Sequence, residues 1–285
     1  MTIVGFGLVL AAACCHAIWN FFVKRINGGP ELVWLFSLIS AGLYLPVAAV
    51  ILLKTEASIG QSEIAFVAAS AMLHLGYFLL LQQGYRRGDL SLVYPTARAT
   101  GPLLSTTFAV VILAEKISVQ IAVGAVAIVV GMLFLTGGFR GRGRHLGASI
   151  LFGLGAGVLI GSYTVWDAYT VSALAVSPLL LDYASSIGRT VLLSPVAARR
   201  RALVRAHWRE HRLGVLAIAV FNPLAYILVL YALTFTPVVY VAPTREISVL
   251  ITVLMGSILL REGDLGRRLR WATLILFGVV LLATG

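Results

Sequence analysis

The chain has 285 residues, of which 60% are hydrophobic and only 12% are charged, and its mean hydropathy is +0.97. Soluble domains carry about 25% charged residues, so this composition excludes an ordinary soluble protein. The formal net charge of +11 does not indicate nucleic-acid binding, because the basic residues lie in short segments between apolar runs. In such segments they set membrane topology and contact anionic lipid.

Ten apolar runs follow one another along the chain, each near the length of about 20 residues that crosses a bilayer. Turn-forming residues such as Gly28-Gly29-Pro30 and Gly137-Gly138 separate them. We therefore predict an all-α polytopic membrane protein with ten transmembrane helices. The predicted spans are residues 3–23, 31–53, 63–84, 90–113, 118–138, 146–168, 176–195, 213–233, 237–260 and 266–284.

The basic residues predict an orientation in the membrane. Of the 22 Lys and Arg residues, 17 lie in the odd-numbered connections or at the span ends that border them, and only Lys54 and Lys116 lie in even-numbered ones. Since basic connections favour the cytoplasmic side, ten spans would leave both termini outside the cell, in what we expect to be a bacterial inner membrane. The longest basic connection, residues 196–212, is predicted to be a short helix on the membrane surface.

An internal repeat relates the two halves of the chain. Each repeat holds five spans, and because five is odd, the second repeat would enter the membrane upside down. Inverted repeats of this kind build many secondary transporters, whose sites lie near the midplane between the halves. We divide the chain into a first five-helix repeat (1–138), a basic connecting loop (139–147) and a second, inverted repeat (148–285). Four residue pairs share the offset of 147: Trp19 with Trp166, Arg98 with Arg245, Glu115 with Glu262, and Gly131 with Gly278.

Three short stretches, together with the ten-span length and the repeat, resemble the EamA-type branch of the drug/metabolite transporter (DMT) superfamily. The resemblance covers the whole chain and implies an exporter of amino acids or other small metabolites, aromatic amino acids included. Many members of this branch carry basic residues at the N-terminus and in even-numbered loops, whereas this chain carries them in odd-numbered ones. The stretches are His16-Ala17-Ile18-Trp19-Asn20, Ile112-Leu113-Ala114-Glu115-Lys116 and Leu259-Leu260-Arg261-Glu262-Gly263.

Two arginines related by the repeat, Arg98 and Arg245, lie within predicted spans. A charge inside a membrane costs about 2.5–3.5 kcal/mol on insertion scales unless it is paired or hydrated. One interpretation is that these arginines bind a substrate carboxylate or another anion. The other is a structural ion pair or a gate, with Glu246, Asp167 and Asp182 as embedded partners.

His74 and Tyr77 are three residues apart, on one face of the third span. An intramembrane histidine is a candidate for function, although it could also be bonded to a neighbouring carbonyl. We predict that His74 contacts substrate or couples transport to protons, and Asp167 and Glu246 are further candidates for proton coupling.

Aromatic and amide side chains supply the remaining candidates for substrate contact. Together with the charged residues they would form a pocket with aromatic walls and a few polar points, which suits a small ligand. The two tryptophans would also fit membrane-interface anchors, and the tyrosines would also fit helix packing. These candidates are Tyr94, Trp19, Tyr163, Trp166, Asn222 and Tyr226.

Four prolines are predicted to bend or break the fourth and ninth spans and to act as gates or hinges, because proline removes a backbone donor. They are Pro95, Pro102, Pro237 and Pro243. Residues 93–116 are accordingly interpreted as a cavity-lining helix, since broken helices in a membrane occur only beside protein or a wet cavity.

Enzyme motifs are missing from the sequence: there is no Gly-x-Ser-x-Gly, no His-Glu-x-x-His, no phosphate loop and no acidic metal cluster. We therefore expect no catalytic residues, no metal and no cofactor. The sequence favours a secondary transporter that exports aromatic or large hydrophobic amino acids by alternating access. The alternatives are an exchanger of anionic metabolites or sugar phosphates, and a non-transporting membrane enzyme or assembly subunit. The expected partners are a small-molecule substrate and membrane lipid, not nucleic acid, with the chain a monomer or homodimer.

Overall fold

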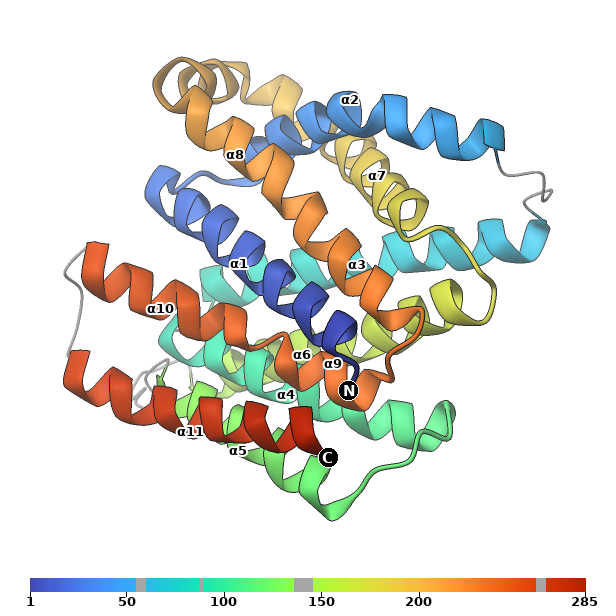
Figure 1. The fold of residues 1–285 in the computed structure, drawn as a ribbon. Helices are drawn as coiled ribbons and strands as arrows, with labels where there is room; N and C mark the ends of the chain where they lie inside the picture. The colour runs from blue at the N-terminus through green and yellow to red at the C-terminus, as the bar shows by residue number, and fades with distance from the viewer. Residues whose placement is uncertain (55–59, 88–89, 136–145, 260–264) are drawn as a thin grey trace.

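A computed structural model describes residues 1–54, 60–87, 90–135, 146–259 and 265–285. The regular structure within these ranges is helical, and it confirms the predicted all-α class (Figure 1). The predicted spans correspond to single helices except the ninth, which is divided between two. The helices are α1 (Ile3–Ile26), α2 (Pro30–Lys54), α3 (Gln61–Arg87), α4 (Leu90–Ile112), α5 (Val119–Leu135), α6 (Leu146–Ser172), α7 (Pro178–Arg199), α8 (Arg201–Leu233), α9 (Val238–Thr244), α10 (Ile247–Leu259) and α11 (Leu265–Thr284).

Five helices of the described chain are long and apolar enough to cross a membrane: Ile3–Val23, Pro30–Lys54, Gln61–Leu81, Gly147–Ser172 and Arg201–Leu233. Apolar side chains such as Leu43, Leu45 and Val47 of α2 are exposed on the protein surface. Soluble monomers rarely expose such contiguous apolar surface, and lipid would cover it here.

The basic connection before the eighth span contains a helix, as predicted. α8 begins at Arg201, and its first part ends at His211, where the backbone (φ −131°, ψ 26°) is not helical. The bend separates a basic segment, residues 201–210, from the apolar part of α8 that crosses the fold (Figure 1).

The two proline-containing spans differ from each other. α4 continues as a helix through Pro95 and Pro102, so neither proline breaks it. Helix prolines are tolerated where neighbouring helices satisfy the freed backbone groups, and α4 packs extensively on α6.

The ninth span is interrupted at Arg245 and Glu246, one residue beyond Pro243 and directly after Thr244, which ends α9. The amide of Glu246 bonds the Pro243 carbonyl and that of Ser248 bonds the Arg245 carbonyl. These three-residue hydrogen bonds tighten the turn between α9 and α10. Pro237 precedes the first residue of α9 as its N-cap.

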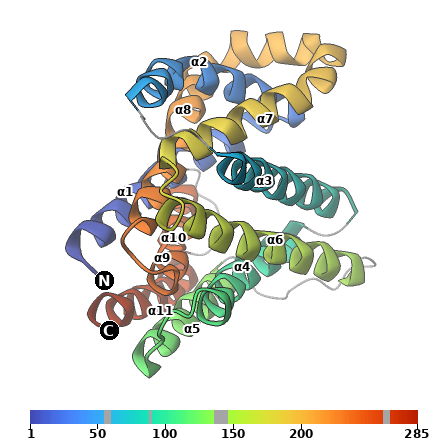
Figure 2. The same ribbon diagram turned by 90° about the vertical axis from the view of Figure 1, so that its right-hand side faces the viewer.

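The two halves of the chain are interlocked, because the most extensive helix contacts join one half to the other. α4 packs on α6, α1 on α8, α3 on α6, α2 on α7 and α5 on α11. In Figures 1 and 2, α2, α7 and the start of α8 lie at one edge of the molecule, α5 and α11 lie at the opposite edge, and most of the other helices lie between them.

Small residues allow two of these contacts to be close, as expected for membrane helices. A Cβ atom on Gly157 of α6 would lie 2.5 Å from the Thr100 Cβ of α4. On α5 and α11, a Cβ on Gly278 would lie 2.6 Å from the Gly124 carbonyl oxygen. The glycines of the fifth and tenth spans therefore serve packing within one chain.

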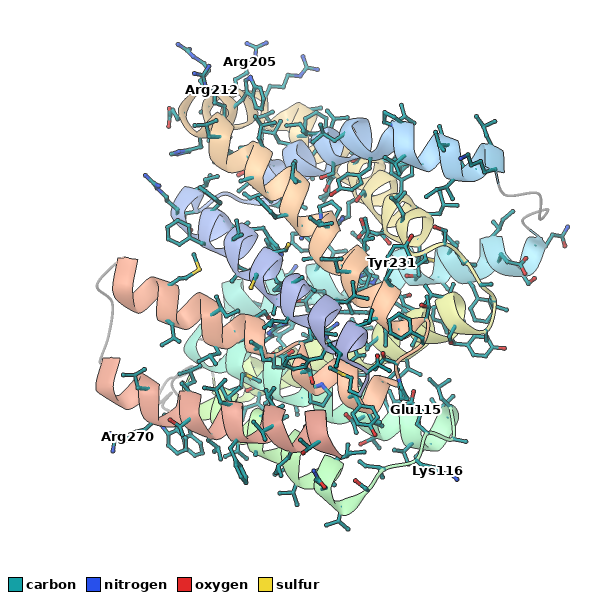
Figure 3. The ribbon with its side chains drawn as sticks, in the orientation of Figure 1. Glu115, Lys116, Arg205, Arg212, Tyr231 and Arg270 are labelled. Carbon is teal, nitrogen blue, oxygen red and sulfur yellow. The ribbon has the colours of Figure 1, made fainter. Side chains whose placement is uncertain are left out.

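Basic side chains gather at one end of the helices. Arg205, Arg212 and Arg270 lie at one side of the molecule, whereas Glu115 and Lys116 lie at the other side with both termini (Figures 1 and 3). The structure thus separates these odd-numbered connections from the connection that holds Lys116.

Candidate functional site: a buried polar centre between the repeats

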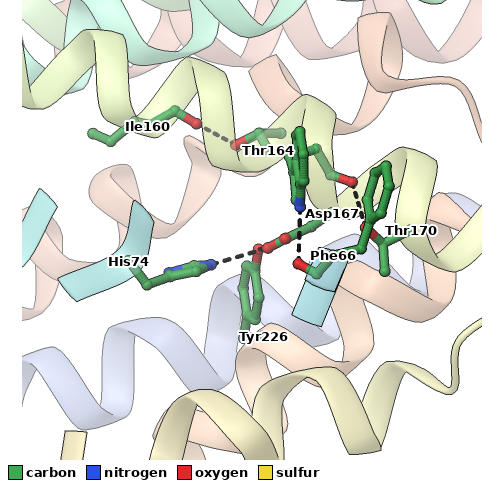
Figure 4. A network of polar contacts seen from close by, with 8 residues as sticks. Phe66, His74, Ile160, Thr164, Asp167, Thr170 and Tyr226 are labelled. Atoms are coloured by element: carbon green, nitrogen blue, oxygen red, sulfur yellow. Dashed lines mark hydrogen bonds and ion pairs between the residues drawn. The ribbon is translucent and has the colours of Figure 1, made fainter. Parts of the chain in front are cut away.

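A buried carboxylate on α6 joins three helices near the middle of the fold. Asp167 is fully buried, and its Oδ2 lies 2.9 Å from His74 Nε2 of α3. The hydroxyl of Tyr226, from α8, donates to the same oxygen (Figure 4). The sequence prediction named all three residues, and the structure brings them into contact.

Aromatic rings surround this contact. His74 stacks on Tyr163 with ring centroids 4.0 Å apart, and Tyr163 meets Tyr77 and Tyr226 edge-on, with centroids 5.9 Å and 6.3 Å away. We call His74, Tyr77, Tyr163, Asp167 and Tyr226 the histidine cluster. It offers a flat aromatic wall beside an ionisable pair.

The two carboxylate oxygens of Asp167 differ in the number of hydrogen bonds that they accept. Oδ2 accepts from two groups, while Oδ1 is buried and has no hydrogen-bond partner in the described part of the chain. An unpaired buried polar atom is costly. Buried Asp and His side chains in contact are the kind of group from which membrane proteins build proton relays.

A second charged group lies at the break between α9 and α10. Arg98 Nε of α4 lies 3.3 Å from Glu246 Oε2, and both side chains are largely buried. Arg98 Nη2 also lies 3.4 Å from the Ser248 hydroxyl. Glu246 therefore pairs with the arginine of the opposite repeat. We call Arg98, Arg245, Glu246 and Ser248 the arginine cluster.

Arg245 is the repeat counterpart of Arg98, but its surroundings differ. The side chain is 6% exposed, and its Nε and Nη2 have no hydrogen-bond partner among the described residues. Glu246 Oε1, at the same break, also has none there. Buried guanidinium donors and carboxylate acceptors are expensive to leave unpaired, so this pair of groups could bind a ligand that carries both charges.

The charges of the two clusters act on shared neighbours. Tyr163 is subject to the charges of Arg98, Arg245, Asp167 and Glu246. His16 of α1 is subject to the charges of both arginines. Asp167 and Glu246 are 0% exposed, so both carboxylates are closed to solvent in this conformation.

Other predicted residues have different surroundings. Trp166 Nε1 donates to the Phe66 carbonyl at 2.9 Å, and its ring stacks on Phe66. Trp19 Nε1 donates to His16 Nδ1 at 3.1 Å. Both tryptophans thus make contacts outside the two clusters.

The remaining predicted positions are Asn222, Tyr94 and the prolines. Asn222 is half-buried on α8. Tyr94 and Pro95 lie in α4, but their side chains are outside the described residues. Pro102 and Pro243 are buried in their helices.

Two residues of the centre were not predicted to be site residues. His16 could have been found from the repeat, because the offset of 147 pairs it with Tyr163. Ser248 could not, because serine is common in membrane helices and its position depends on the turn at residues 245–246.

The interlocked helical repeats, with charged residues of both halves at their centre, define a polytopic membrane transporter. The particular family is shown by the sequence: the pattern of the EamA-like transporter family matches residues 3–137 and 147–284, so the chain belongs to this family of the DMT superfamily. A comparison with curated protein sequences finds no match.

One protein of known crystal structure is similar over 100% of this chain and 98% of its own, with a TM-score of 0.72 and 12% sequence identity. At this identity the likeness concerns the fold alone.

Proposed function

We propose that this protein is a secondary transporter that exports aromatic or large hydrophobic amino acids by alternating access. The observation that carries this proposal is that two oppositely charged groups, each with buried polar atoms that lack hydrogen bonds, lie near aromatic rings. Arg245 presents buried donors and Glu246 a buried acceptor, while Tyr163 and His74 form stacked rings nearby. A zwitterionic amino acid would place its carboxylate at Arg245, its ammonium at Glu246 and its side chain against the rings.

The interruption at residues 245–246 gives a physical basis for movement. Residues at element ends absorb the φ/ψ changes of a hinge, and this one carries the proposed ligand groups. Rocking of the halves about the centre would open it first to one side of the membrane and then to the other. Pro237 and Pro243 flank α9 and, with Pro95 and Pro102 of α4, are proposed to bend or gate these helices.

The first experiment is uptake of labelled amino acids into proteoliposomes that contain the purified protein. We expect saturable uptake of tryptophan or phenylalanine, and weaker competition from analogues that lack either the carboxylate or the amino group. In Arg245→Gln, the preference for the amino acid over its decarboxylated amine should fall. The matched control is Arg189→Gln, which removes an arginine of α7 that bonds Ser186 instead. No amino-acid flux through folded, inserted protein would refute the proposal.

The same site also supports a second candidate, an exchanger of anionic metabolites or sugar phosphates. The observation in its favour is that two arginines, Arg98 and Arg245, act on the same centre. Competition by phosphorylated compounds, with none by amino acids, would establish this alternative.

Proton coupling is proposed for His74 and Asp167, since the pair can share a proton inside the fold. In Asp167→Asn the pair can no longer carry a net charge of −1, so the pH gradient should no longer drive uptake, while exchange of labelled for unlabelled substrate continues. Asp182→Asn removes another buried carboxylate, on α7, and should leave the gradient dependence unchanged. Gradient-driven uptake by Asp167→Asn would exclude Asp167 as the coupling group.

A further inference from the structure

A cavity of about 380 Å³ lies away from the polar centre, where α2, α7 and the basic first segment of α8 meet. This volume is within the range of small-ligand sites, about 300–1,000 Å³. Its lining is mainly apolar, from Trp34, Ala197, Ala198 and Val204, with Ser194, Arg201 and Arg205 as its polar residues.

The basic segment is fixed in place over this cavity. Arg200 Nη1 donates to Glu31 Oε2 at 2.9 Å, and His207 Nε2 lies 3.7 Å from Glu31 Oε1. Glu31 is buried at the start of α2. On the cavity wall, the Trp34 indole donates to the Ser194 hydroxyl at 3.1 Å and so joins α2 to α7.

The charges on the cavity wall have no ion-pair partner in the part of the chain that the structure describes. Arg201 and Arg205 form no ion pair with a carboxylate of the described chain. Their neighbour Arg200 is paired with Glu31, so the two arginines on the wall remain open to an external anion. Guanidinium groups bind phosphate through two parallel hydrogen bonds.

We propose that this cavity binds an anionic phospholipid, with its headgroup phosphate at Arg201 and Arg205 and the start of an acyl chain against the apolar wall. Charge complementarity and the apolar lining favour a lipid over free phosphate. The location agrees with this occupant, because the cavity lies where a basic helix joins two membrane-crossing helices, at the end of the molecule where Arg205 and Arg212 project (Figure 3). The bound lipid would hold the basic segment against α2 and α7.

The test is native mass spectrometry of the full-length protein released from nanodiscs that contain either phosphatidylglycerol or phosphatidylcholine. We expect retained phosphatidylglycerol, and a loss of roughly fivefold in its apparent affinity for each of Arg201→Gln and Arg205→Gln. The matched controls are the single variants Arg209→Gln and Arg212→Gln, each of which removes one charge from a residue that does not line the cavity.

A second variant tests the cavity without changing charge. Ala198→Trp would fill it, and should reduce retention of phosphatidylglycerol while leaving both arginines in place. An equal loss in the Arg209→Gln and Arg212→Gln controls would show diffuse attraction to the basic segment and overturn the proposal. Inorganic phosphate that displaces the lipid completely at equal concentration would show a phosphate site instead. These measurements need no transport, so they succeed or fail independently of the proposed substrate.

Discussion

Glu246 illustrates how strongly the stability of the protein depends on the ion-pair partner of a buried charge. Its carboxylate is 1% exposed in the pair with Arg98, and its partner comes from the other repeat. Removal of one member of a buried ion pair leaves the other uncompensated and costs about 3–5 kcal/mol, whereas removal of both costs less. We expect Arg98→Gln and Glu246→Gln each to destabilise the protein by about this amount, and the double variant to lose much less than their sum.

The measurement is a double-mutant cycle on unfolding in mixed micelles. Arg189→Gln combined with Glu246→Gln provides the control, because Arg189 lies on α7 and bonds Ser186. The control pair should be additive. Additivity for the Arg98 and Glu246 variants would show that their contact contributes no coupling.

At the residue scale, the sequence predicted which side chains lie in the polar centre. It predicted less well which of them contact one another. Composition alone makes embedded His74, Asp167, Arg98 and Arg245 conspicuous, since charges in apolar spans are costly. Their pairing depends on helix rotations that no local pattern specifies. The contact of His74 with Asp167 joins α3 to α6, and the contact of Arg98 with Glu246 joins α4 to the α9–α10 turn.

Among the helices, the contact between α4 and α6 depends on glycine at its closest point. A methyl group on Gly157 would lie 2.5 Å from the Thr100 Cβ and 3.3 Å from the Ala97 carbonyl oxygen. Overpacking of this kind costs about 1–3 kcal/mol. We therefore expect Gly157→Ala to lower the thermal unfolding temperature of the purified protein in detergent.

Gly147 supplies the control on the same helix. A methyl group on Gly147 would have no atom of the described chain within 4 Å, so Gly147→Ala should leave the unfolding temperature unchanged or slightly raised. If both variants have the same unfolding temperature, Gly157 is not required for the close approach of α4 to α6.

Glu115 links the end of the fourth span to the start of α9. Its two carboxylate oxygens accept from the amides of Val238 and Val239 at 2.8 Å and 2.9 Å. These are free amides at a helix N-terminus, where a negative charge is favourable. Glu115→Ala should destabilise the protein by about 1–2 kcal/mol, as measured by unfolding in mixed micelles.

The neighbouring substitution Lys116→Ala removes an exposed charge and should cost almost nothing. Glu115→Gln keeps one acceptor oxygen but no charge. Its loss of unfolding free energy should lie between the losses for Lys116→Ala and Glu115→Ala. A loss for Lys116→Ala equal to that for Glu115→Ala would indicate a general effect of the loop instead of a helix cap.

At the element scale, hydrophobic run length predicted the helices well because crossing a bilayer fixes how many apolar residues are needed. The prolines were less informative. Pro102 remains inside a continuous α4, while Pro243 precedes a real interruption. The difference lies in the surroundings, since α4 is held along the glycine face of α6, and such packing cannot be seen in the sequence of α4.

Basic residues are distributed asymmetrically over the whole molecule, and this asymmetry should fix one orientation in the membrane. Of the 22 Lys and Arg residues, 17 fall in odd-numbered connections or at the span ends that border them, and Arg205 and Lys116 project at opposite sides (Figure 3). Such a strong bias favours a single insertion with the basic side in the cytoplasm. Both termini, which lie at the other side in Figure 1, would then be outside.

Cysteine labelling tests this orientation. The chain has only two cysteines, Cys14 and Cys15, and replacing both with alanine gives a background for single reporters at the exposed positions Lys116 and Arg205. A membrane-impermeant maleimide should label Lys116→Cys in intact cells, and should label Arg205→Cys only after the cells are permeabilised. The reverse pattern would place the termini in the cytoplasm, as in many members of the branch. Labelling of both reporters in intact cells would mean that the protein inserts in both orientations and that the charge bias does not fix one. The proposal of export in a single direction would then be wrong.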